Sequence, residues 1–285
     1  MIDPQRAFAR LVLQHELGPR FVGSPGHGRA QELLRGWLAA ADVAGEQVFV
    51  ERFFDREVTC RNLWGEFAGD QPGRLLLGSH YDTRPWADLD PDEARRREAV
   101  PGANDGGSGV ALLCELAVEL KERRNRPTVQ VVLFDAEDWH EIDGKEVSLG
   151  ARHFAAELAG PERPDAVIVV DMVGGRDLML DVDVNCQAHD PSYRLTLGLF
   201  QLGHALALPA CSLKKAHPYK WIGCDHTPFM AAGIPTALLI DLDYPEWHTT
   251  ADRPAACAAE SLGQMGSLLD AFLFAPAPAF EQRVA

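Results

Sequence analysis

The stretch Val129-Gln-Val-Val-Leu-Phe-Asp-Ala-Glu-Asp138 sets the pattern of this chain, because an apolar run gives way to a cluster of acids. A short apolar run bounded by polar residues is typical of a strand that is buried on both faces of a sheet. The same pattern recurs at residues 74–80, 166–171 and 235–241, and each of these runs ends in a histidine or an acid. We therefore expect four buried strands whose ends carry polar side chains.

Helical segments fall between these runs. The first 45 residues read as two helices, and Ser24 followed by Pro25 is typical of the start of the second. Residues 47–54 and 58–67 predict two paired strands. Further helices are predicted at the positions 106–120, 148–159, 191–206 and 258–274. Strands alternating with helices predict an α/β three-layer sandwich, in which helices flank a central mixed, mostly parallel, twisted sheet.

Composition narrows the classes of function. The chain has 285 residues, of which 46% are hydrophobic, enough for one large domain or two small ones, and we expect residues 1–285 to form a single domain. A net charge of −15 argues against a nucleic-acid partner, and no apolar run is long enough to cross a membrane. The N-terminus lacks the shape of a signal peptide, which predicts a cytoplasmic protein, or a periplasmic or secreted one if a leader has been removed. We expect a monomer.

The six cysteines show no Cys-x-x-Cys spacing, so a structural zinc knuckle is not expected. A chain of this length needs no disulfide for stability. We expect all six to be reduced and mostly buried.

Six carboxylate and imidazole side chains stand where predicted strands end or in the loops beside them. In sheets of this kind, ligands bind beyond the carboxyl ends of the strands. Taken one at a time, each of these residues could equally be a helix cap or a core residue. Their shared placement predicts one site, which is made by His80, Asp105, Glu137, Asp138, Asp171 and His248.

The residue types in this set suit a metal. Asp105, Asp138 and His248 supply two carboxylates and one imidazole, which fits a catalytic zinc that keeps one open position. Glu137 then stays free as an acid/base, and repulsion among the carboxylates should raise the pKa of at least one of them. His80 and Asp171 either hold a second metal or contact the ligands of the first without binding it.

Other residues could shape a substrate pocket. Trp247 precedes the last histidine of the set and could form a pocket wall, and Trp86, in the long polar loop 81–101, could cover the pocket. The charged residues of that loop are otherwise expected to be a solvated surface. Asp225 either caps a short helix or reaches the site to bind substrate. Cys224 is more typical of a small buried residue than of a reactive thiol.

With these motifs in hand, the chain resembles the zinc-dependent M28 aminopeptidase family. Within that family it is most similar to the glutaminyl cyclases, or glutaminyl-peptide cyclotransferases, of the animal and bacterial zinc type. The motifs that carry the resemblance are Ser79-His-Tyr-Asp, Gly102-Ala-Asn-Asp, Phe134-Asp-Ala-Glu-Asp, Ser148-Leu-Gly-Ala-Arg-His, Asp171-Met-Val-Gly-Gly, Asp225-His226-x-Pro-Phe and Pro245-Glu-Trp-His-Thr.

The resemblance implies a zinc aminopeptidase-like fold and an acyltransferase that acts on peptide or protein N-termini bearing glutamine. The product would be pyroglutamate, and ammonia would be released. The resemblance implies that Asp105, Asp138 and His248 bind one zinc. It makes Glu137 the acid/base and Asp171 its hydrogen-bonding partner. Trp247 would be an aromatic wall of the substrate pocket, and His80 would be a ligand position that cyclases keep without binding a second zinc.

Two positions depart from the animal cyclases. Asp138 stands where they have glutamate, a variant that bacterial relatives share, and Cys224 stands where they have an aspartate of a proton network. A thiol is a poor substitute in such a network, which puts that role in doubt.

The alternative is a two-zinc aminopeptidase of the same family. In that arrangement, His80 and Asp138 would hold one metal, Asp171 and His248 the other, and Asp105 would bridge them. Glu137 would then activate a water. A peptide-binding relative without activity is disfavoured, because no member of the candidate site is missing from the sequence.

Overall fold

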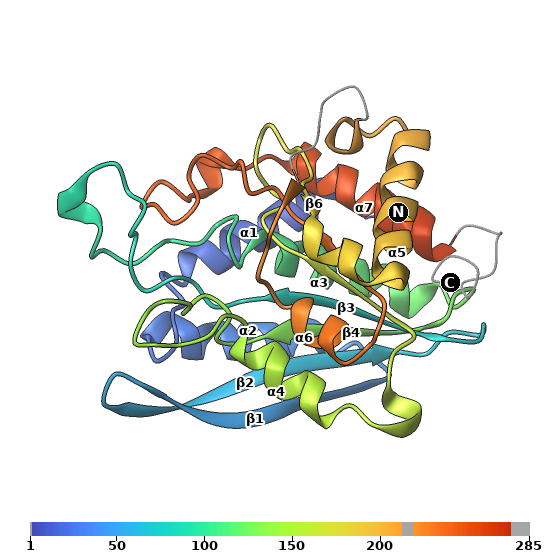
Figure 1. Ribbon diagram of the computed structural model, residues 1–285, viewed down its shortest axis with the longest axis horizontal. Coiled ribbons are helices and arrows are strands. Elements are labelled where there is room, and N and C mark those ends of the chain that lie inside the picture. Colours follow the sequence, from blue (N-terminus) through green and yellow to red (C-terminus); the bar gives the residue numbers. More distant parts are fainter. Residues whose placement is uncertain (1, 213–218, 275–285) are drawn as a thin grey trace.

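A six-stranded sheet forms the centre of the computed structural model, which describes residues 2–212 and 219–274 (Figure 1). Across the sheet the strands are β1 (Val43–Phe53), β2 (Arg56–Phe67), β4 (Thr128–Phe134), β3 (Arg74–His80), β5 (Ala166–Val170) and β8 (Thr236–Leu239). β2 pairs antiparallel with both of its neighbours, and all the other pairs are parallel. The predicted mixed, mostly parallel sheet is therefore confirmed.

Helices cover both faces of this sheet. The helices are α1 (Pro4–Glu16), α2 (Pro25–Leu38), α3 (Ser108–Glu122), α4 (Leu149–Glu157), α5 (Asp190–Ala205), α6 (Thr227–Ala231) and α7 (Ala259–Phe274). Side chains of α1, α2, α3, α5 and α7 share one hydrophobic core with Ile168 and Val170 of β5, whereas side chains of α4 and α6 share another with Val167 and Val169. Because successive residues of a strand point to opposite faces, β5 serves both cores, and the three-layer sandwich is confirmed (Figure 1).

Local sequence signals account for several boundaries. The Ser24 side chain accepts a hydrogen bond from the backbone N–H of His27, with Pro25 in the first turn, as predicted for the start of α2. β1 begins at Val43 rather than at residue 47, because the hairpin ladder with β2 continues through backbone pairs as far as Val43 and Glu66. A second, short sheet pairs β6 (Val182–Asp183) with β7 (Tyr219–Lys220).

The start of α3 lies unusually close to the sheet. A Cβ atom added at Gly109 would lie 2.2 Å from the carbonyl oxygen of Val170. Only glycine permits that approach without a shift of the backbone. The close packing brings the loop before α3 to the carboxyl ends of the parallel strands, which is where the candidate site residues lie.

All six cysteines are buried, as predicted, and none is in a disulfide. Within residues 2–212 and 219–274, no helix combines the length and the apolar character needed to cross a membrane.

Candidate active site

The fold brings all six predicted site residues to the carboxyl edge of the parallel strands. His80 is the last residue of β3, and Asp171 directly follows β5. The acid pair 137–138 lies in the turn after β4, Asp105 in the loop before α3, and His248 in the loop after β8. Every one of these side chains is buried. Such a concentration of buried charge needs compensating partners, and a metal ion is one of them.

Two overlapping groups have metal-ligand spacing, and Asp105 belongs to both. Within each group the ligand atoms lie within 4.8 Å of one another. In one group, His248 Nε2 is 3.2 Å from Asp138 Oδ1 and 3.4 Å from Asp105 Oδ2. In the other, His80 Nε2 is 3.2 Å from both Asp105 Oδ1 and Asp171 Oδ1. The two oxygens of Asp105 thus face different groups.

This grouping corrects the pairing expected for a two-metal arrangement. His80 lies with Asp171, not with Asp138, and Asp138 lies with His248. The reason is the strand order: β5 pairs with β3 directly, so the residues that end these strands are neighbours. Asp138 lies beyond the end of β4, and the turn carries it toward the loop of His248.

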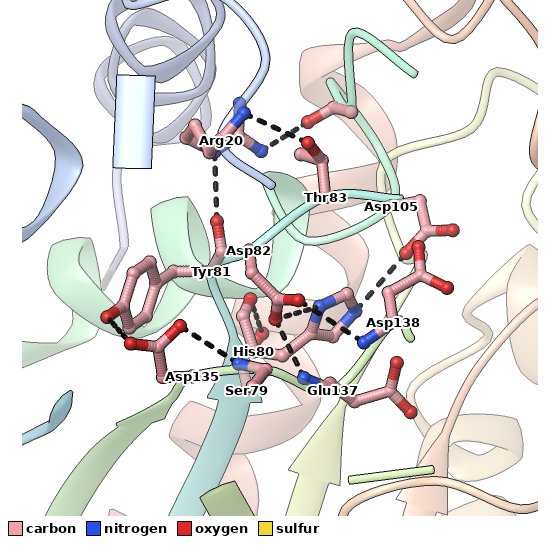
Figure 2. Close-up of polar contacts among 12 residues, drawn as sticks. Arg20, Ser79, His80, Tyr81, Asp82, Thr83, Asp105, Asp135, Glu137 and Asp138 are labelled. Carbon is pink, nitrogen blue, oxygen red and sulfur yellow. Dashed lines mark hydrogen bonds and ion pairs between the residues drawn. The ribbon is translucent and has the colours of Figure 1, made fainter. Parts of the chain in front are cut away.

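A buried carboxylate holds the turn of the acid pair. Asp82 accepts hydrogen bonds from the backbone N–H of Glu137 at 2.9 Å and of Asp138 at 3.3 Å (Figure 2). The preceding residue, Ala136, has a φ of +55°, a conformation that a non-glycine residue adopts only under constraint. This role of Asp82 was not predicted, although Asp82 stands in the same His-Tyr-Asp motif as His80.

A second buried carboxylate does the same for the loop of Asp105. Asp252 accepts from the backbone N–H of Asn104 at 2.8 Å and of Asp105 at 3.1 Å. Burial, together with the charge of Asp105, raises the pKa of Asp252 to about 7. The next residue, Gly106, has a φ of +79°, and a Cβ there would lie 2.2 Å from the carbonyl oxygen of Asp82. The loop therefore depends on glycine at this position.

Glu137 is the buried acid beside these groups. Its side chain accepts a hydrogen bond from the Ser148 hydroxyl at 3.2 Å. Burial raises its pKa well above 4.5, against the opposing charge of His80, and the neighbouring charges of Asp225, Asp138 and Asp171 add to the rise. The direction agrees with the repulsion expected among the site carboxylates. A carboxyl whose pKa is raised toward the working pH can both take and return a proton.

Asp171 has other hydrogen-bond partners than the resemblance implies. Its carboxylate lies 3.2 Å from His80 Nε2, and it accepts from the Cys224 thiol at 3.5 Å. Among the described residues, no hydrogen bond joins it to Glu137. The two acids act on each other through charge.

A small cavity of about 40 Å³ joins these residues. Its walls include Glu137, Asp171, Cys224 and Trp247, and the Trp247 ring centroid lies 4.3 Å from that of His248. Four larger surface grooves, of about 300 to 660 Å³, contain none of the six site residues. The six candidate residues therefore gather around the small cavity and not around the large grooves.

Two residues predicted to contact substrate do not line this cavity, although the charge of one of them, Asp225, acts on Glu137. Trp86 lines one of the large grooves together with Phe54 and Trp139. Asp225 is fully buried and is not among the residues that line the cavity. It does not cap α6 either, because the residue at the capping position is His226.

The loop 81–101 is less solvated than its charges suggested. Arg84 and Asp90 are buried, and Asp90 accepts hydrogen bonds from both the backbone and the hydroxyl of Thr250. Arg84 reaches Asp138, one of the candidate ligands. The sequence analysis missed these contacts, because a long polar loop gives no signal of the surface against which it packs.

The chain is similar to known proteins in sequence and in fold. A model described as peptidase family M28 matches residues 62–273. Glutaminyl-peptide cyclotransferase of Bos taurus is 24% identical, and the match covers 91% of this chain and 80% of that protein. Aminopeptidase YwaD of Bacillus subtilis is 26% identical, over 71% of this chain and 41% of that protein.

Two solved structures are similar over nearly the whole chain. Glutaminyl cyclase of Tannerella forsythia is 26% identical with a TM-score of 0.87, covering 97% of this chain and 100% of that one. Glutaminyl cyclase of Fimbriiglobus ruber is 27% identical with a TM-score of 0.83, covering 94% of this chain and 93% of that one. The zinc aminopeptidase-like fold implied by the sequence motifs is thereby confirmed.

Proposed function

The chain belongs to peptidase family M28, and we propose that it is a glutaminyl-peptide cyclotransferase, which converts N-terminal glutaminyl residues to pyroglutamyl residues and releases ammonia. One observation carries the proposal: the buried Glu137 carboxylate shares a small cavity with a three-residue ligand group and with Trp247. The cyclases that match this chain from end to end support it.

The ligand group fits zinc. Asp105, Asp138 and His248 offer two carboxylates and one imidazole, a donor set that zinc accepts. Asp138 Oδ2 is buried and has no hydrogen-bond partner, as expected of an atom intended for a cation. When bound, zinc supplies a Lewis acid that polarises the γ-amide carbonyl of the substrate.

Glu137 handles the proton in this proposal. The neutral α-amine of the substrate attacks its own γ-amide carbon, and Glu137 takes the proton that the amine loses. As the bond from that carbon to the amide nitrogen breaks, Glu137 returns the proton, and ammonia leaves. The Ser148 hydroxyl and the Asp82 carboxylate hold Glu137 in place from its side chain and its backbone. Folding the substrate over itself supplies proximity.

Trp247 would form one wall for the substrate. Its ring lies beside His248 in the cavity lining, where an apolar face can pack on the methylene groups of a glutaminyl side chain. The charge of Asp171 acts on Glu137, and we propose that this keeps the acid/base in the pKa range that it needs.

The second candidate is an aminopeptidase, and a specific observation favours it. The group of His80, Asp105 and Asp171 also has ligand spacing, so the site could hold a second ion. Glu137 would then take a proton from water instead of from the substrate amine.

Mass spectrometry of a Gln-Xaa-Xaa peptide incubated with zinc-loaded protein tests the proposal, with metal-free protein as the control. We expect the peptide to lose ammonia while its chain stays intact. Release of free glutamine, or of other N-terminal residues from control peptides, would overturn the cyclase proposal and establish the aminopeptidase.

A further inference from the structure

The loop after β3 contains a buried arginine that none of the proposed chemistry uses. The Arg84 side chain is 3% exposed. Its Nε and Nη2 donate to the two carboxylate oxygens of Asp88, at 2.8 and 2.7 Å, and its Nη1 donates to Asp138 Oδ1 at 3.2 Å. A guanidinium bound through two parallel hydrogen bonds is fixed in direction as well as in distance. Arg84 therefore links Asp88 rigidly to Asp138.

The other end of this link faces His248. Asp88 Oδ1 lies 3.7 Å from His248 Nδ1, the ring nitrogen opposite the one that faces the candidate ligands. The same loop is tied to His248 through its backbone, because the N–H of Leu89 donates to the His248 carbonyl at 3.3 Å. One arginine–aspartate pair thus contacts two of the three proposed zinc ligands: His248 at the ring nitrogen that faces away from the group, and Asp138 at Oδ1.

We infer that Arg84 and Asp88 are positioning residues that set the zinc affinity of the site, an inference that rests on the proposed function. Histidine ligands commonly direct their second nitrogen at a carboxylate, which fixes the ring and strengthens it as a ligand. Asp88 is the carboxylate that faces the second nitrogen of His248, at 3.7 Å. Arg84 binds one oxygen of Asp138 and leaves Oδ2 buried and unpartnered, so this carboxylate presents one free oxygen.

The charges of the pair explain why both members are needed. A lone arginine beside a zinc site would repel the ion and weaken its binding. Asp88 neutralises that charge at hydrogen-bond distance. Removing the charge of Asp88 therefore has two effects in the same direction: His248 loses its carboxylate, and the charge of Arg84 is left uncompensated.

Zinc dissociation constants of the full-length variants D88N, R84K and the double variant test the inference, measured by competition with a chromogenic chelator. D88N is a nearly isosteric change at a side chain that is 40% exposed. R84K keeps the positive charge but loses the planar guanidinium that binds both oxygens of Asp88. Arg95 and Glu98 form a matched, exposed pair of the same loop, with two contacts of 3.2 Å, so R95K and E98Q are the controls. Thermal unfolding of the metal-free proteins establishes that each variant folds.

We expect D88N and R84K each to weaken zinc binding by about 10- to 100-fold. The double variant should lose little more than the larger single loss, because the two residues act through one linked pair. The R95K and E98Q controls should bind zinc as the unaltered protein does. Unchanged zinc affinity in D88N and R84K, or losses of affinity that multiply in the double variant, would overturn this inference but leave the proposed function standing. Failure of the unaltered protein to bind zinc would overturn the proposed zinc site itself.

Discussion

Replacing Glu137 with glutamine tests the acid/base role most directly. Glutamine keeps the shape of the side chain and an oxygen that can accept from Ser148, and the backbone contact with Asp82 is untouched. What is lost is the ability to carry a proton. General acid–base catalysis typically contributes 10²- to 10⁴-fold in rate, so kcat should fall by that factor, or about 3 to 5 kcal/mol of activation free energy. Zinc content should not change.

The same variant should lose activity without losing stability. Because the pKa of Glu137 is raised in the folded protein, the wild-type protein loses folding free energy as the pH rises from about 4.5 through the folded pKa. Glutamine has no such titration, so the metal-free variant should be at least as stable as wild type at about pH 8. Lower activity with equal or higher stability cannot be explained by damage to the fold.

Ammonia release from a glutaminyl peptide gives the rate, and thermal unfolding gives the stability. The matched control is E141Q, an exposed acid of the same segment, which should leave both unchanged. A kcat of the Glu137→Gln variant within tenfold of wild type would refute the acid/base assignment.

Three further predictions concern the supports of the site. D82A leaves two buried backbone N–H groups without an acceptor, at about 1 to 3 kcal/mol each, so the melting temperature and zinc affinity should both fall, and unchanged values would contradict the role of Asp82. Burial lowers the pKa of His27, but the charge and hydrogen bond of Asp135, 2.8 Å away, together with the charge of Asp82, raise this pKa above 6.5. Stability from this pair is full below about pH 6.5 and is lost as the pH rises through the raised pKa, so urea unfolding of H27Q should lack that pH dependence. W247A should raise KM for a glutaminyl peptide roughly 2- to 10-fold with W247F largely restoring it, and an unchanged KM would exclude the proposed wall.

The sequence predicted the sheet and the membership of the site from one feature, the polar residue at the end of an apolar run. His80 and Asp171 each follow an apolar run, and the rule on carboxyl ends places both at the same edge of the sheet. Ser24 and Pro25 set the start of α2 through contacts within one turn. These features are local, and local features can be read from the order of the residues.

The contacts within the site could not be read in the same way. The sequence predicts that Trp86 and Trp247 both shape the substrate pocket, yet only Trp247 lines the cavity. Asp225 and Cys224 are adjacent in the chain, yet it is the cysteine that lines the cavity and donates to Asp171. The direction in which a loop side chain points is set by the surface against which the loop packs, and that surface comes from distant parts of the chain.

The sequence by itself determined which chemical groups this protein gathers at one edge of its sheet, because strand periodicity and the turn residues that follow it are local. The tertiary structure decided which of those groups lie next to one another. Strand order placed His80 with Asp171 and Asp138 with His248, and long-range backbone contacts to Asp82 and Asp252 fixed the two turns that carry acids. These arrangements depend on residues more than fifty positions apart, and their contacts form only when the whole sheet and its helices are packed.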